Sequence, residues 1–315
     1  GKNTMKPRIL VVGAGAVGGY FGARLAAAGH DVTFLVRPGR LRQIRADGLH
    51  LVSAAGDASI SPQMITADEI THPYDIVLLS VKAYSLAQAM DDFSAAVGVE
   101  TCIVPLLNGM RHLDVLAERF GADAVLGGTC FIVSTLDADG RIVQTGPQPR
   151  LSYGERSGVD TPRVHAISAA LSAPGFDTVL SPHIMQDMWD KWVLLASLGT
   201  LCCLMRGTVG DVARQPYGQD FARATVAECV AVAGASGHPP ADGVVERTIR
   251  MLTAESSTLT SSMFRDLSQG AAIEAGQIIG DLVARARSYA VATPILDLVD
   301  LNLRVYEGRR ADKGR

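Results

Sequence analysis

The sequence predicts an α/β protein, with an N-terminal doubly wound parallel sheet followed by an all-helical C-terminal domain. Three observations support this class. Apolar runs rich in β-branched residues alternate with helix-like segments over the first half of the chain, a glycine-rich turn follows the first of these runs, and almost every segment after residue 182 has helical spacing. Strands that alternate with crossover helices favour a parallel sheet with helices on both faces.

The individual elements follow from periodicity and from turn residues. The first strand, 8–12, stops at Gly13, and a helix-like stretch, 17–28, ends at Gly29. Further predicted strands are 31–36, 75–80, 101–106, 124–133 and 177–180, with helices at 85–96, 111–119 and 162–172. Short antiparallel strands are expected after Phe131. The helical half is expected to contain 183–206, 218–235, 243–253, 271–290 and 294–307.

Length and composition suggest two globular domains. At 315 residues the chain exceeds the usual single core, and 48% hydrophobic with 19% charged residues is typical of a folded protein. We place the boundary at Ser181-Pro182, which gives a nucleotide-binding domain over 5–181 and a helical substrate and dimerisation domain over 182–315.

Charge and cysteine usage indicate no nucleic-acid or membrane partner. The net charge of −3 provides no global positive field. The longest apolar run, 192–205, is shorter than the roughly 20 residues that span a bilayer. The cysteines lie in apolar stretches without metal-ligand spacing and are interpreted as reduced core residues of a cytoplasmic protein, although a redox pair at Cys202-Cys203 is an alternative.

The turn after the first strand matches the dinucleotide-binding pattern GxGxxG. It consists of Gly13, Ala14, Gly15, Ala16, Val17 and Gly18. In this position the glycines allow a tight turn, close approach of a pyrophosphate and close packing of helix on strand, while the helix N-terminus attracts the anion. A Rossmann-type domain is therefore expected.

Residues after the next strands favour NADP(H) over NAD(H). The second strand ends at Arg37, where an NAD site normally has an acidic residue for the ribose hydroxyl. A guanidinium at this place can pair with a 2′-phosphate, and Arg40 and Arg42 are candidates to assist it. Lys82 follows the strand 75–80 and is a second candidate for the cofactor phosphates; a solvated lysine is the alternative, as a solvated loop charge is for Arg37.

One lysine is the candidate proton donor of the helical half. Lys191 lies in the segment Met188–Trp192 and is the only lysine between Lys82 and Lys313. A lysine among bulky apolar residues either extends to water or is held for a function, and these residues alone leave both interpretations open.

Together these motifs resemble the ketopantoate reductase (2-dehydropantoate 2-reductase) family. The resemblance extends from about Ile9 to Tyr306. It rests on the glycine turn, Arg37, Val81-Lys82-Ala83, Leu107-Asn108-Gly109-Met110, Trp189-Asp190-Lys191-Trp192, Ser261-Ser262-Met263 and Glu274.

The resemblance implies NADPH-dependent reduction of a small 2-oxo acid, usually in pantothenate synthesis. It implies that Lys191 is the general acid, that Asn108 lies beside nicotinamide and substrate, that Glu274 binds substrate hydroxyl groups, and that Ser262 contacts the carboxylate. From the residues alone, a surface charge at Glu274 and a helix N-cap at Ser262 are the plainer interpretations. A homodimer is consistent with a helical second domain that has apolar faces.

The sequence departs from the family pattern on the lysine helix. The family commonly has asparagines one and two turns after the lysine, where this chain has Leu195 and Gly199. The pocket is therefore expected to be more apolar, and a different 2-oxo acid is an alternative substrate. A non-catalytic NADPH sensor and a β-hydroxyacid dehydrogenase are further alternatives. Arg206, at the end of this helix, is a candidate anion contact, but helix-end charge is the simpler explanation.

Overall fold

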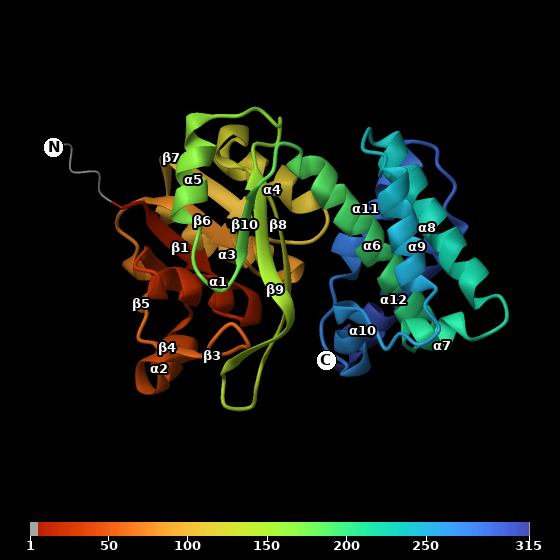
Figure 1. Cartoon of the computed structure of the whole chain (residues 1–315), viewed down its shortest axis with the longest axis horizontal. Coiled ribbons are helices and arrows are strands. Elements are labelled where there is room, and N and C mark those ends of the chain that lie inside the picture. Colours follow the sequence, from red (N-terminus) through yellow and green to blue (C-terminus); the bar gives the residue numbers. More distant parts are fainter. Residues whose placement is uncertain (1–5, 315) are drawn as a thin grey trace. The chain divides into compact units, whose positions relative to one another are not determined.

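The computed structural model describes residues 6–314, so Met5, the predicted start of the first domain, lies outside them. The chain forms two compact units. The first comprises the described residues up to Leu107 together with His112–Ile184, and the second comprises Asn108–Arg111 and the chain from Met185 onward. Figure 1 shows both units, which are described in turn.

The first unit contains a five-stranded parallel sheet with the order β5-β2-β1-β6-β7. From β1 the chain adds β2 and β5 on one side and then returns to add β6 and β7 on the other, so the order reverses between β1 and β6. In the register, Val12 of β1 pairs with Leu35 of β2 and with Leu79 of β6. The carboxyl ends of these three strands are therefore level. The strands are β1 (Arg8–Val12), β2 (Asp31–Leu35), β5 (Gln63–Ile65), β6 (Tyr74–Leu79) and β7 (Val97–Pro105).

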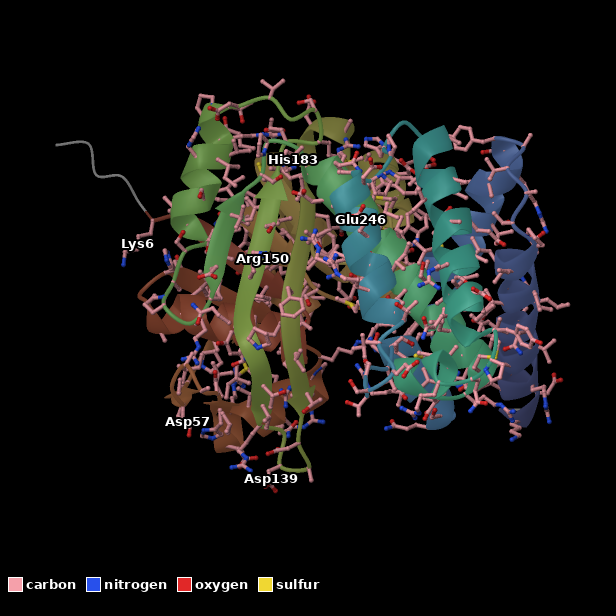
Figure 2. All side chains as sticks on the ribbon, turned by 45° about the vertical axis from the view of Figure 1, so that its right-hand side comes forward. Lys6, Asp57, Asp139, Arg150, His183 and Glu246 are labelled. Atoms are coloured by element: carbon pink, nitrogen blue, oxygen red, sulfur yellow. The ribbon has the colours of Figure 1, made fainter. Side chains whose placement is uncertain are left out.

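A second sheet in the same unit has the order β10-β9-β3-β4, and β8 pairs with β9. The antiparallel structure predicted after Phe131 is confirmed for β8 and β9, whose hairpin carries Asp139 at its tip (Figure 2). The strands β3 and β4 were not predicted, because they are short and lack a sustained alternation. The bounds are β3 (Leu49–Val52), β4 (Ala58–Ile60), β8 (Gly127–Leu136), β9 (Ile142–Gly154) and β10 (Asp177–Leu180).

Helix α1 joins the two sheets into one core. It contacts β2 of the first sheet and β8 and β9 of the second. Its close approach to β2 requires Gly22, where a Cβ would lie 2.6 Å from the Phe34 ring. The helices of this unit are α1 (Ala16–Ala27), α2 (Pro38–Asp47), α3 (Leu86–Phe93), α4 (Arg111–Phe120) and α5 (Pro162–Ala170), with short 3₁₀ turns at 67–69, 83–85, 94–96 and 122–124.

The second unit is helical, as predicted. Its elements are α6 (Ile184–Met205), α7 (Val209–Ala213), α8 (Gly218–Ala235), α9 (Asp242–Leu252), α10 (Ser262–Ser268), the π-helix η5 (Gly276–Gly280), α11 (Asp281–Ser288) and α12 (Pro294–Lys313). With 22 residues, α6 is longer than the predicted apolar run and passes a length and composition test for a membrane span. However, 67% of its apolar window is buried, as in the core helix of a globular unit.

The predicted helix 271–290 is only partly correct. Residues 271–274 are not helical, and the π-helix η5 precedes the regular helix α11. The indole of Trp192 donates a hydrogen bond of 2.8 Å to the carbonyl oxygen of Ile278. A side chain that bonds a helix carbonyl from outside commonly accompanies such a local distortion, and hydrophobic periodicity cannot reveal it.

All five cysteines are free and buried. Burial raises the pKa of the Cys202 thiol and raises that of Cys203 to about 12. A buried thiol with a raised pKa provides little thiolate for exchange, so packing explains the adjacent pair better than a redox role does.

The start of α12 generates a stability prediction. The Glu228 carboxylate on α8 accepts hydrogen bonds from the N–H groups of Ile295 and Leu296 at 3.0–3.1 Å, and so satisfies orphan donors of the helix. We expect Glu228→Ala to lower the free energy of unfolding by about 1–2 kcal/mol in urea denaturation. Glu246→Ala is the matched control, because Glu246 is an exposed carboxylate on α9 (Figure 2), and a change within about 0.5 kcal/mol is expected there. Equal losses would remove the capping role of Glu228.

Candidate active site

The glycine turn after β1 is formed by close backbone contacts. Gly13 has φ +101°, and a Cβ there would lie 2.4 Å from the carbonyl oxygen of Ser80. A Cβ on Gly18 would lie 2.3 Å from the carbonyl oxygen of Gly13. Both positions therefore require glycine, because any side chain would collide with backbone. The turn is held against the end of β6, where the Ser80 N–H donates to the Val12 carbonyl at 3.0 Å.

The middle glycine of the turn provides open space beside a helix N-terminus. Gly15 is the N-cap of α1 and no side chain caps the helix there. A Cβ on Gly15 would meet nothing within 4 Å, and its φ is an ordinary −79°. No steric need of the protein explains a glycine here, whereas close approach of a pyrophosphate to the helix N–H groups does. These residues fit a dinucleotide.

The predicted cationic residues follow the neighbouring strands at the same edge. Arg37 is the exposed N-cap of α2 and comes two residues after β2, while the exposed Lys82 comes three residues after β6. A ligand at the carboxyl ends of the strands, where the strand order reverses, is the common arrangement in open parallel sheets. The edge thus presents positive side chains on both sides of the glycine turn.

Arg40 is hydrogen-bonded to the glycine turn. Its guanidinium donates hydrogen bonds to the Ala14 carbonyl at 3.1 Å and to the Gln43 side chain at 2.9 Å. Partial burial lowers the pKa of this guanidinium. Arg40 is thus fixed on the glycine turn, while Arg37 and Arg42 are both exposed. Ser134, which the sequence did not indicate, donates to the Ala16 carbonyl at 3.1 Å from β8.

In the second unit, Lys191 is set in an aromatic environment on α6. It is half-buried, and its neighbours Trp189 and Trp192 are buried with ring centroids 4.7 Å apart. The guanidinium of Arg285 lies 5.6 Å from the Trp192 ring. These contacts pack the helix turn that carries the lysine, so the backbone from which the Lys191 side chain extends is held in place.

The π-helix η5 connects Lys191 with two other predicted residues. Gln277 on η5 donates a hydrogen bond of 2.8 Å to the carbonyl oxygen of Asn108, and the adjacent Trp192 bonds Ile278. Glu274, half-buried, ends the segment that leads into η5, and the Ile278 N–H donates to its carbonyl at 3.0 Å. The backbone of Asn108, the neighbour of Lys191 and the backbone of Glu274 are therefore each bonded to one short distorted helix.

Gln277 is a buried polar residue of the candidate site that the sequence did not indicate. It is 7% exposed, and its amide lies 3.2 Å from the Cβ position of Gly109, whose φ of +79° allows the Asn108-Gly109 turn. A glutamine within an apolar helical run was the available signal. It was lost because helical periodicity treats one polar residue as a solvent-facing position.

Ser262 is the first residue of α10. The N-cap of α10 is Ser261, whose hydroxyl accepts a hydrogen bond from the Phe264 N–H at 3.0 Å. The helix N-cap that was the alternative interpretation of Ser262 is therefore its neighbour, Ser261. Ser262 is exposed. Met263 connects α10 with the lysine helix, because a Cβ on Gly199 would lie 2.9 Å from its terminal methyl carbon.

The side chains of residues 6–314 include no group of three His, Cys, Asp or Glu residues that could hold a metal ion. The two sets of residues are a dinucleotide cradle in a Rossmann unit and a half-buried lysine beside two tryptophans in a helical unit. Together they define a pyridine-nucleotide oxidoreductase as the class of this protein.

Comparison with known proteins identifies the family. The ketopantoate reductase PanE/ApbA family matches residues 9–158, and its C-terminal domain matches residues 183–307. The chain belongs to the ketopantoate reductase family and is an NADP-dependent oxidoreductase that acts on a 2-oxo acid.

Two curated relatives match over nearly the whole chain. An uncharacterized oxidoreductase, YkpB, of Bacillus subtilis is 37% identical and covers 96% of this chain and 100% of its own length. The 2-dehydropantoate 2-reductase of Halobacterium salinarum is 30% identical and covers 93% of this chain and 97% of its own.

Solved structures share the fold. The 2-dehydropantoate 2-reductase of Methylococcus capsulatus is 30% identical with a TM-score of 0.85, and covers 96% of this chain and 97% of its own. A D-mandelate dehydrogenase solved with NADH and anilino(oxo)acetate has a TM-score of 0.84 at 21% identity, covering 96% of this chain and 99% of its own. The latter similarity concerns the fold alone.

Gly15 generates a prediction for the cofactor site. Gly15→Ala should lower the free energy of unfolding by no more than about 1 kcal/mol, the usual cost of alanine at an N-cap, because the Cβ meets no protein atom. The same Cβ would stand where the pyrophosphate approaches, so the Kd for NADPH, measured by fluorescence titration, should rise about tenfold or more. Gly243→Ala is the control, since its Cβ on α9 also meets nothing within 4 Å. Unchanged NADPH affinity in Gly15→Ala would place the cofactor elsewhere.

Proposed function

We propose that this protein reduces 2-dehydropantoate to pantoate with NADPH, as a cytoplasmic step of pantothenate synthesis. The single observation that carries the proposal is that η5 accepts a hydrogen bond from Trp192, the neighbour of Lys191, and donates one to the Asn108 carbonyl, while Glu274 lies two residues before η5. The relative from Halobacterium salinarum, named 2-dehydropantoate 2-reductase, supports the substrate. Buried, free cysteines support a reducing compartment. Homodimerisation stays a prediction.

In this proposal the cofactor, when bound, supplies a hydride to the ketone carbon. The glycine turn 13–18 and Lys82 hold its phosphates, and Arg37 pairs with the 2′-phosphate. Lys191 donates a proton to the ketone oxygen, because an ammonium stabilises negative charge as it develops there. The Asn108 amide orients the reacting groups from a turn fixed by Gln277.

The remaining polar residues distinguish the two ends of the substrate. Glu274 can accept a hydrogen bond from the substrate hydroxyl, and the Ser262 hydroxyl can donate to the carboxylate. A carboxylate acceptor that binds a hydroxyl discriminates strongly against an analogue without it, because the acceptor then loses its partner.

A second substrate class, a 2-oxo acid with an apolar tail, is favoured by the surface beyond Lys191. Leu195 lies one turn after the lysine, and the space beside Gly199 is filled by the thioether of Met263. Neither side chain can hydrogen-bond a hydroxyl, so this part of the unit suits hydrocarbon.

Replacement of the lysine tests the mechanism. Lys191→Ala should lower kcat for 2-dehydropantoate by roughly a hundredfold to ten-thousandfold with little change in NADPH affinity. Lys191→Arg is the matched variant: it keeps a positive charge but is a far poorer acid, so it should also lose most activity. Ordinary turnover in Lys191→Ala would exclude this lysine from proton transfer, and activity in the arginine variant alone would restrict its role to charge.

A matched pair of substrates tests the specificity. 3,3-Dimethyl-2-oxobutanoate replaces the hydroxymethyl group of 2-dehydropantoate by methyl and changes nothing else. We expect kcat/KM, followed by NADPH absorbance, to be at least about tenfold higher for 2-dehydropantoate, because only that substrate offers Glu274 a hydroxyl. The reverse order would instead assign the site to apolar 2-oxo acids through Leu195 and Met263.

A further inference from the structure

A basic hollow in the helical unit lies outside the group around η5. It has a volume of about 700 Å³, within the range of small-molecule sites, and is lined by residues of α6, of α10 and the segment that follows it, and of α12. Its charged lining residues are all positive: Arg206, Arg309, Arg310 and Lys313. In a chain of net charge −3, such a concentration is a local feature that needs an explanation.

Helix-end electrostatics account for only part of this charge. Arg206 follows the last residue of α6, and Lys313 ends α12, so both stand where a cation complements the helix dipole. A helix C-terminus carries about half a negative charge, and two such ends cannot balance four cationic side chains. Within residues 6–314, Arg206, Arg309 and Lys313 form no ion pair.

Arg206 is kept at a backbone conformation that favours glycine. Its φ is +57°, in the left-handed region, while the next residue is Gly207. The Arg206 N–H bonds the Cys202 carbonyl at 2.8 Å, which fixes this end of α6. A non-glycine residue in this region costs free energy, and such positions often coincide with ligand sites.

The opposite wall is fixed by two hydrogen bonds from α12. The Tyr306 hydroxyl donates to the Ala271 carbonyl at 2.6 Å, and Arg310 Nε donates to the Gly270 carbonyl at 3.1 Å. Arg310 keeps further N–H donors for an anion. The acidic residue whose charge reaches Tyr306 is Asp266, which is not among the lining residues. Leu204, Leu267 and Val305 supply apolar surface next to the cations.

We propose that this hollow binds an organic diphosphate with a planar ring, such as a nucleoside diphosphate. The guanidinium groups of Arg206, Arg309 and Arg310, with Lys313, bind the phosphate oxygens, since arginine matches their geometry with paired donors. The ring packs on Tyr306 and the apolar wall. This site is separate from the cofactor turn at residues 13–18 and does not depend on the proposed substrate.

The experiment is calorimetric titration of ADP into the protein saturated with NADPH, so that the glycine turn is already filled. ADP should bind, and the double variant Arg206→Gln/Arg309→Gln should weaken it at least tenfold. The control variant Arg223→Gln/Arg250→Gln removes the same charge from exposed positions on α8 and α9 and should leave ADP affinity within about twofold.

Inorganic pyrophosphate has the phosphate groups but no ring, so its affinity tests the contribution of the ring. It should bind at least tenfold more weakly than ADP. Equal binding of pyrophosphate would overturn the ring contact. No heat with ADP, or equal losses in both double variants, would overturn the site. A change of sedimentation coefficient confined to the Arg206→Gln/Arg309→Gln variant would also overturn it, because the hollow would then be an interface between copies of the chain.

Discussion

The parallel register of β1 with β2 and β6 is the constraint on which the cofactor site depends. Because Val12 is level with both Leu35 and Leu79, the three strands end together, and the segments that follow them leave from one edge. The glycine turn can approach β6 closely only because Gly13 and Gly18 lack side chains. Two glycines are thus explained by the protein itself, whereas Gly15 is explained only by a ligand.

A comparable constraint in the helical unit is the π-helix η5. A regular α-helix over these residues would return each carbonyl to the helix ladder, whereas here the Ile278 carbonyl accepts from Trp192. The same element donates from Gln277 to Asn108, a residue that lies 169 positions away in the chain. The amide N–H of the buried Gln277 and the indole N–H of the buried Trp192 both donate hydrogen bonds. Burying these two polar groups therefore leaves neither donor without an acceptor.

Much of the fold could be predicted because strong local signals agreed with it. The runs 8–12 and 75–80, the glycine turn and the helix 218–235 each combine clear periodicity with recognisable end residues. The short strands β3 and β4 could not be predicted, because β3 depends on pairing with the distant β9 and β4 in turn pairs with β3. The start of the predicted helix 271–290 failed for a related reason, since its non-helical residues are determined by tertiary contacts.

Some residues of the candidate site could likewise be predicted from the sequence, and others could not. Residues whose type alone is unusual in its setting, such as Lys191 among tryptophans or Arg37 at a strand end, could be selected from sequence. Gln277 could not, because its hydrogen bond to the Asn108 carbonyl joins two positions that are far apart in the chain. Ser262 shows the converse, since the capping function expected of a serine there is performed by Ser261.

Gly199 illustrates why single positions are a poor guide to specificity. Considered alone, a glycine on the lysine face suggests an enlarged pocket. The space is instead filled by Met263 from α10, whose flexible thioether packs directly on the glycine backbone. Any larger residue at 199 must therefore displace Met263, and the effects of substitutions at these two positions cannot be additive. The polarity of this surface is consequently a property of the pair, because a hydroxyl-binding group at 199 requires the flexible end of the Met263 side chain to move.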